Sequence, residues 1–309
     1  MRKRWITLFA LASLTLTAVG CGSQPAAPSA PAQTPAAAST DKPAAKDPRI
    51  ASMSIHLTNH LLALGVKPAG SVIGGDVKDF LPHVKDRLDG VQKLGVVTDP
   101  DMEAVLALKP DTIYIDEKYS AADKAKYEKI AKTETFNLDD GTWRDTLKKV
   151  AKLLSKDAQA EAFIKDYETH AERVRKLMAD QLGPDAKAMA IRVTAKELRV
   201  MGMARPVGPF MFEDLKLKPA KGVEKINKAY EVISQEVLPD FDADAIFVIV
   251  NKDGEAEKVF KQLEANPLWA GLKAVKNKHV YVVEGNPWLD YSSLGHKLAL
   301  DNAEKLLKK

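Results

Sequence analysis

The segment Asp157–Leu182 constrains the fold of this chain more than any other. Its apolar residues recur at steps of three or four, the spacing of one helix face: Phe163, Tyr167, Ala171, Val174, Met178 and Leu182. The opposite face is charged, no glycine or proline interrupts the segment, and Gly183 and Pro184 follow it. The segment predicts one helix roughly 40 Å long. We interpret it as a stiff connection between two lobes; a long surface helix on one domain is the alternative.

Strand and helix patterns alternate on both sides of this helix. Strands are expected at residues 49–55, 67–73, 112–116, 134–138, 187–195, 197–203, 245–250 and 279–284. Helices are expected at residues 58–64, 100–108, 121–133, 143–154, 255–263 and 291–307. Such alternation is typical of mostly parallel sheets covered by helices. We therefore expect an α/β protein with two Rossmann-like lobes, residues 49–156 and 183–309, and a ligand cleft between them.

The first residues have the pattern of a secretory signal peptide. Arg2, Lys3 and Arg4 precede an apolar stretch at residues 5–19, which is too short for a stable transmembrane helix, and small residues then lead to Cys21. We expect residues 1–20 to be the signal peptide. Residues 21–48, rich in Ala, Pro, Ser and Thr, are expected to be a disordered linker. Cys21 is the only cysteine, so the fold has no internal disulfide.

Charge and motifs narrow the function classes. The formal net charge of +4 falls close to neutral once Arg2, Lys3 and Arg4 are removed, which argues against a nucleic-acid partner. The sequence contains no Gly-x-Ser-x-Gly elbow, HExxH motif, P-loop or Gly-x-Gly-x-x-Gly fingerprint. We therefore expect a binding protein and no enzyme, in preference to a secreted hydrolase or a sensor that acts through a separate membrane receptor.

Two segments on opposite sides of the long helix share a pattern. Glu103 is followed by Asp111 and an apolar strand pattern, and Glu236 is followed at the same spacing by Asp244. Each copy predicts a short helix with an acid in its first turn, a tight loop closed by the aspartate, and a core strand. A favourable contact with the helix dipole explains either glutamate alone. The repetition also fits an acidic contact that both lobes present to a two-fold symmetric partner.

From residue 49 onward the chain resembles the substrate-binding lipoproteins of bacterial ABC importers, and among them the iron–siderophore binders. The resemblance rests on residues 49–52, 64–68, 103–111 and 233–244, and on NPLW at 266–269 with LKAVKN at 272–277. It implies that Glu103 and Glu236 dock onto arginines of the permease dimer. Residues 18–21 resemble a lipobox, with Ala18 where Leu is more usual. This implies lipidation of Cys21 and anchoring on the outer face of the cytoplasmic membrane.

The resemblance further implies a ferric siderophore as ligand, with cobalamin or haem as alternatives in the same importer class. The chelator would hold the iron, so we expect no resident cofactor and no metal site in the protein. Aromatic residues are only 6 % of the chain, whereas lysines and arginines number 46. This composition favours hydroxamate or citrate-type chelates over haem or cobalamin.

Arginines are the first class of candidate ligand residue, because open α/β sheets bind ligands at the carboxyl ends of their strands. Arg192 lies within an apolar strand pattern, where a charge must be paired. It meets either an internal carboxylate or an anionic ligand, and the resemblance favours the ligand. Arg199 and Arg205 follow, and each alone is more readily a solvated surface charge. A guanidinium matches carboxylate and hydroxamate oxygens, so we expect Arg192, together with Arg199, to bind the chelate.

Aromatic and polar residues after strands form the second class. We interpret Trp288 and Tyr291, in a turn after the strand at 279–284, as a cleft wall. Trp143 either lines the cleft or packs against the core, and Tyr119 occupies a similar position. After the first strand the sequence places His56, Asn59 and His60. The resemblance implies that these three bind the ligand, although a structural role fits equally well, and two histidines alone are weak evidence for zinc.

Overall fold

The computed structural model describes residues 48–75, 77–252 and 254–308. The signal peptide expected at residues 1–20, the lipidation expected at Cys21 and the linker up to residue 47 lie outside these residues. In the part of the chain that is described, no helix combines the length and the apolar character that crossing a membrane requires.

The first lobe is built on a six-stranded sheet in the order β4-β3-β2-β1-β5-β6. Its strands are β1 (Ile50–Ser52), β2 (Gly70–Ile73), β3 (Gln92–Val96), β4 (Asp99–Pro100), β5 (Thr112–Asp116) and β6 (Lys132–Phe136). All neighbours are parallel except β3 and β4. Its helices are α1 (Ile55–Ala63), η1 (Lys85–Leu88), α2 (Met102–Leu108), α3 (Glu117–Ser120), η2 (Ala121–Asp123), α4 (Lys124–Glu128) and α5 (Trp143–Leu153).

The second lobe is built on a sheet in the order β10-β8-β7-β11-β12, with β9 beside β7. Its strands are β7 (Lys187–Val193), β8 (Leu198–Met201), β9 (Lys218–Pro219), β10 (Tyr230–Ile233), β11 (Ala245–Val250) and β12 (Val280–Val283). The strands β7, β11 and β12 are parallel, whereas β8 is antiparallel to both of its neighbours. Its helices are the π-helix η3 (Pro209–Asp214), η4 (Val223–Lys225), η5 (Gln235–Phe241), α7 (Gly254–Glu264), α8 (Pro267–Gly271), α9 (Lys273–Lys276), α10 (Gly285–Trp288) and α11 (Ser293–Leu307).

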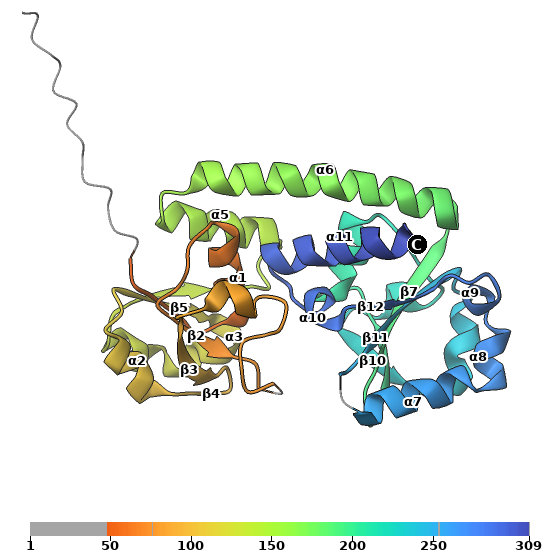
Figure 1. Ribbon diagram of the computed structural model, residues 1–309, viewed down its shortest axis with the longest axis horizontal. Helices are drawn as coiled ribbons and strands as arrows, with labels where there is room; N and C mark the ends of the chain where they lie inside the picture. The colour runs from red at the N-terminus through yellow and green to blue at the C-terminus, as the bar shows by residue number, and fades with distance from the viewer. Residues whose placement is uncertain (1–47, 76, 253, 309) are drawn as a thin grey trace, which may run out of the picture. The chain divides into compact units, whose positions relative to one another are not determined.

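The helix α6 (Asp157–Leu182) follows the first sheet and precedes the second, which confirms the helix predicted for this segment. Its predicted apolar stripe is buried at Tyr167, Ala171, Val174 and Met178. Figure 1 shows α6 running alongside α5 and α11, and it packs against both of them. The α/β class with two sheet-containing lobes is therefore confirmed.

The closing helix α11 does not belong to the second lobe alone. It packs against α6, α10 and β12, but also against α1 and α5 of the first lobe. As a result, one hydrophobic cluster includes Leu61 of α1, Val174 of α6, Phe247 of β11 and Leu300 of α11. The two lobes therefore share part of their core.

Several elements whose residues are little buried were predicted at the wrong position or missed. The helix expected at residues 121–133 is divided into η2 and α4, and its last two residues begin the strand β6. The edge strand β10 was missed because its side chains are mostly exposed, so it lacks the apolar alternation that marks a half-buried strand. The strand β3 was missed for a similar reason, since of its five residues only Leu94 is buried.

The repeated Glu–Asp pattern has the same local structure in both lobes. Asp111 Oδ2 accepts a hydrogen bond from the backbone N–H of Arg49 at 2.8 Å, and Asp244 Oδ2 accepts one from Lys187 N–H, also at 2.8 Å. Each contact fixes the start of a central strand pair, β1 with β5 and β7 with β11. The predicted loop closed by an aspartate is thus confirmed in both copies, although the second copy begins with the 3-10 helix η5.

Candidate functional site

Residues that follow strands of the two sheets meet at a boundary between the lobes. In the second lobe, β12 leads through α10 to Asp290, which contacts His56 just after β1 of the first lobe. A second contact across the same boundary joins Asp139, which follows β6, to Arg205, which follows β8. This boundary is the expected place for a ligand in open α/β sheets.

A buried carboxylate, Asp290, joins the lobes at one point of the boundary. It accepts hydrogen bonds from His56 Nδ1 at 2.9 Å, from Asn59 Nδ2 at 2.6 Å and from His83 Nε2 at 3.1 Å. Burial alone would raise the pKa of Asp290, but the contacts with His56 and His83 hold this pKa below its usual range. Gly295 leaves room for the carboxylate, because a Cβ there would lie 2.5 Å from Asp290 Cγ. These four residues form the Asp290 cluster: Asp290, His56, Asn59 and His83.

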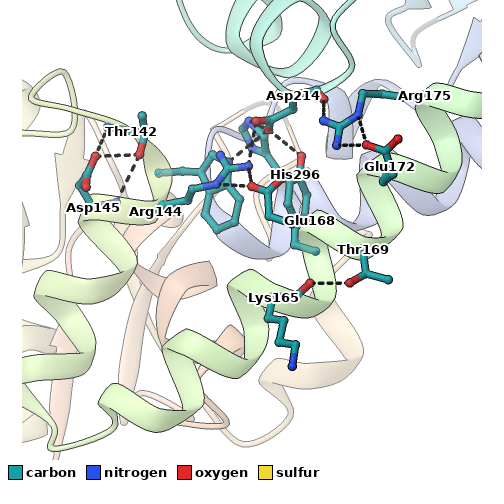
Figure 2. A network of polar contacts seen from close by, with 12 residues as sticks. Thr142, Arg144, Asp145, Lys165, Glu168, Thr169, Glu172, Arg175, Asp214 and His296 are labelled. Carbon is teal, nitrogen blue, oxygen red and sulfur yellow. Dashed lines mark hydrogen bonds and ion pairs between the residues drawn. The ribbon is translucent and has the colours of Figure 1, made fainter.

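A second buried carboxylate, Asp214 of η3, joins the second lobe to α5 and α6. Tyr167 donates its hydroxyl to Asp214 Oδ2 at 2.6 Å, and Trp143 Nε1 donates to the same oxygen at 3.3 Å. Arg144 Nη2 lies 3.0 Å from Asp214 Oδ1, and its Nε donates to Glu168 at 2.8 Å. Figure 2 shows Arg144 between Glu168 and Asp214, with His296 next to Asp214. The second lobe therefore supplies both buried acids, and the first lobe supplies side chains that bind them.

The loop that carries Arg205 is shaped by two glycines. A Cβ on Gly202 would lie 2.3 Å from the carbonyl oxygen of Lys228, and one on Gly208 would lie 2.0 Å from that of Met203. Because only glycine allows these approaches, residues 202–208 form a compact turn after β8. The Arg205 guanidinium lies over the Tyr291 ring, 5.7 Å from its centroid. Arg205 thus stands at the boundary in a defined position.

Arg192 and Arg199 lie side by side in the second sheet. They are direct partners in the antiparallel pair β7–β8, so their side chains share one face of the sheet. Arg192 Nε donates to Asn251 Oδ1 at 2.9 Å, just beyond the carboxyl end of β11. Arg199 pairs with Glu197 at 2.7 Å and lies 4.2 Å from the Tyr230 ring centroid. The two expected ligand arginines are therefore brought together, and both are partly buried.

Two predicted cleft residues are core residues instead. Trp288 is 1 % exposed, stacks on Phe247 and donates Nε1 to Asn302 at 3.0 Å. Trp143 is also 1 % exposed, because its indole packs against Tyr167 and reaches Asp214. Neither indole presents surface to a cleft ligand, so the cleft-wall interpretation of Trp288 is corrected, and the core alternative holds for Trp143.

Three further candidates serve the structure of the boundary. Asn59 is fully buried against Asp290. His60 is buried against Ser293 Oγ at 3.0 Å, and burial lowers its pKa from 6.5 to about 3. Tyr291 is buried beside His296, and burial raises its pKa to about 12. These contacts agree with the structural role that the sequence left open for Asn59 and His60, and the ligand contacts expected of the three side chains stay predictions.

The other candidate residues are accessible. The His56 side chain is 26 % exposed although its Nδ1 bonds Asp290, and Tyr119 is 54 % exposed at the carboxyl end of β5. Glu103 and Glu236 are both exposed, in the first turns of α2 and η5. Their binding and docking roles stay predictions.

Comparisons with known proteins identify the family. Residues 50–287 match the model described as periplasmic binding protein. The iron-uptake system-binding protein of Bacillus subtilis is 31 % identical over 227 residues, covering 72 % of this chain and 70 % of the relative. A probable siderophore-binding lipoprotein of the same organism, YfiY, is 28 % identical over 257 residues, covering 81 % of this chain and 78 % of the relative.

A solved structure agrees with these matches. The triscatecholate siderophore binding protein FeuA from Bacillus subtilis, complexed with ferri-bacillibactin, superposes with a TM-score of 0.70 at 27 % identity. The alignment covers 85 % of this chain and 93 % of that chain. The fold and family that the sequence resemblance implied are confirmed, and this chain belongs to the periplasmic binding protein family.

Proposed function

We propose that this protein captures a ferric siderophore between its lobes and delivers it to the permease of an ABC importer, without catalysing a reaction. The observation that carries this proposal is the pair Arg192 and Arg199, which share one face of the second sheet beside Asn251. The relatives named for iron uptake and siderophore binding support the same ligand class.

The chemistry of the arginine pair fits an iron chelate. A guanidinium stays charged and donates paired hydrogen bonds to carboxylate, hydroxamate or catecholate oxygens. Because the chelator occupies the coordination sphere of the iron, the protein needs to recognise only the outer oxygens, and the metal is cargo. Arg192 is the principal contact in this proposal, and Arg199, His56 and Tyr119 are accessory contacts.

Delivery requires a surface that the permease recognises. Glu103 and Glu236 lie on opposite lobes, both exposed and both in the first turn of a helix that leads to a repeated Asp-closed loop. We propose that this acidic pair docks onto basic residues of a permease dimer. A lipid on Cys21 would hold the protein at the outer face of the membrane where the permease opens.

Fluorescence titration of the mature protein tests the ligand. Ferric citrate, ferrichrome, ferric bacillibactin, cobalamin and haemin are added in turn, with calorimetry as a second readout because the described tryptophans are buried. We expect saturable sub-micromolar binding of one ferric chelate. Arg192→Ala should weaken it at least tenfold, whereas Arg173→Ala, an exposed change on α6, should not. Binding of cobalamin or haemin alone would reassign the ligand, and no binding would refute the proposal.

A separate experiment tests delivery. Glu103→Lys and Glu236→Lys should each lower iron uptake by cells while the affinity for the chelate stays within twofold. Glu255→Lys provides the matched control, since Glu255 is an exposed acid in the first turn of α7. Full uptake by the double variant Glu103→Lys/Glu236→Lys would contradict the docking role. A cellular response to the chelate without iron transport would point to a ligand-sensing partner.

A further inference from the structure

The Arg205 guanidinium is held in place by contacts within the protein. Its loop leaves β8 through hydrogen bonds from Gly202 N–H to Ala229 O at 2.9 Å and from Met203 N–H to Ile226 O at 2.8 Å. Gly208 closes the loop against Met203, where no Cβ fits. The guanidinium rests on the Tyr291 ring, and its side chain is only 15 % exposed. Such a preorganised cation is suited to binding an anion.

The partner of Arg205 is a carboxylate of the other lobe. Asp139 follows β6 in the first lobe, and its Oδ1 accepts a hydrogen bond from Arg205 Nε. In contrast to the arginine, Asp139 is 51 % exposed. Contacts to a carboxylate that is half in water contribute little to stability. A rigid cation is therefore paired across the boundary with an acid that water and solutes can reach.

The surroundings allow Asp139 to leave Arg205 without becoming an isolated charge. Lys118 Nζ lies 3.5 Å from Asp139 Oδ2 and comes from the same lobe. Both cations stabilise the charged form and hold the pKa of Asp139 below its usual range. If a chelate oxygen took over Arg205, Asp139 would keep Lys118 as its partner.

A second acid, Asp116, lies close to the Arg205–Asp139 pair. Asp116, at the carboxyl end of β5, is buried, and its Oδ2 has no hydrogen-bond partner among the described residues. Burial raises the pKa of Asp116, against attraction from Arg205 and His56. The buried Oδ2 has unused hydrogen-bonding capacity at the boundary.

We propose that Asp139 binds the Arg205 guanidinium in the place that an anionic group of the ligand would take. Only a chelate with a free carboxylate or a comparable anionic oxygen displaces Asp139 from Arg205. This inference rests on the proposed function and deepens it, because it assigns selectivity within that site. Arg205 and Asp139 are thereby specificity-determining residues. Neutral chelates gain nothing from the exchange, since they leave the existing ion pair in place.

The test compares one anionic and one neutral chelate. Ferric citrate and ferrichrome are titrated by calorimetry into the wild-type protein, Asp139→Asn and the control Asp140→Asn. Asp140 is the adjacent acid of the same loop and pairs with Lys149 at 3.2 Å. Asp139→Asn should tighten ferric citrate binding about three- to tenfold, the range for releasing a charge-assisted hydrogen bond. Asp140→Asn should change it less than twofold, and ferrichrome should respond to neither.

A double variant shows whether Asp139 acts through Arg205. Arg205→Gln should weaken ferric citrate binding at least tenfold, and adding Asp139→Asn to it should produce no further change. An Asp139→Asn variant that binds ferric citrate no more tightly would overturn the inference, as would an effect that persists in the Arg205→Gln background. In those cases wild-type binding of a chelate would leave the proposed function standing. A wild-type protein that binds no ferric chelate would overturn both.

Discussion

Replacing Asp214 with alanine should destabilise the protein strongly, because this carboxylate joins η3 to α5 and α6. Tyr167 OH and Trp143 Nε1 donate to one of its oxygens at 2.6 and 3.3 Å, and Arg144 lies 3.0 Å from the other. Alanine removes all three contacts at once. It also leaves the buried indole and hydroxyl without an acceptor, and Arg144 with Glu168 as its remaining carboxylate partner.

The size of the effect follows from these contacts. A hydrogen bond to a charged group contributes about 1.5–3 kcal/mol, and breaking a buried charged pair costs about 3–5 kcal/mol. We expect Asp214→Ala to lower the free energy of unfolding by about 4 kcal/mol, and Tyr167→Phe by about 1.5 kcal/mol, since it removes one neutral donor. For a chain of this size the alanine variant corresponds to a fall in Tm of roughly 10 °C.

Urea denaturation followed by circular dichroism and tryptophan fluorescence measures both values. Asp166→Ala is the control, since Asp166 is an exposed acid next to Tyr167 on α6, and its change should stay within about 0.5 kcal/mol. The double variant Tyr167→Phe/Asp214→Ala should be no less stable than Asp214→Ala, because the hydroxyl no longer has a partner to lose. A loss below about 1 kcal/mol in Asp214→Ala, or fully additive effects in the double variant, would refute this reasoning.

Three further predictions address the boundary between the lobes. Asp290→Ala leaves the donors of His56, Asn59 and His83 without this acceptor, so urea denaturation should show a loss of about 3–5 kcal/mol; a loss under about 1 kcal/mol would mean that the cluster does not join the lobes. Because the pKa of His60 falls from 6.5 to about 3 on folding, the unfolded chain binds the extra proton and stability should decline as the pH drops from 6.5 toward 3. His60→Gln should flatten that decline by up to about 1.4 kcal/mol per pH unit, and an unchanged pH profile would contradict this. Gly208→Ala places a Cβ 2.0 Å from Met203 O, so it should displace Arg205 and weaken ferric citrate binding more than Gly254→Ala, where the added Cβ meets open space.

The elements that the sequence predicted well are those with long, uninterrupted patterns. α6, β5 and β11 have the bounds that their apolar residues indicated, because burial along one face or a whole strand leaves a clear period. The repeat around Asp111 and Asp244 was also readable, since each copy depends on local backbone contacts. Short helices such as α8 and α9 contain too few residues to show a periodic pattern.

The candidate site was predicted only in part. Arg192 and Arg199 were found because charges in apolar strand patterns are conspicuous, and β7 and β8 then place them side by side. The indole of Trp288 was misplaced, because a turn position does not reveal that Phe247 and Asn302 enclose the ring.

The acids that join the elements gave no local signal. Asp290 and its partner Asn59 are separated by 231 positions in the chain. Such a contact depends on the packing of α11 against α1, which no window of sequence contains. Asp214 and Asp139 likewise find their partners only through tertiary packing.

The position of α11 has a consequence for how the chain folds. The helix α11, near the end of the described residues, completes a hydrophobic cluster that also contains residues of α1, near their start. Neither lobe can therefore reach its final packing until α11 has been synthesised, and contacts between such distant segments form late. Although the molecule has two sheets, it should unfold in a single cooperative transition. Deletion of α11 should destabilise the first lobe as well as the second.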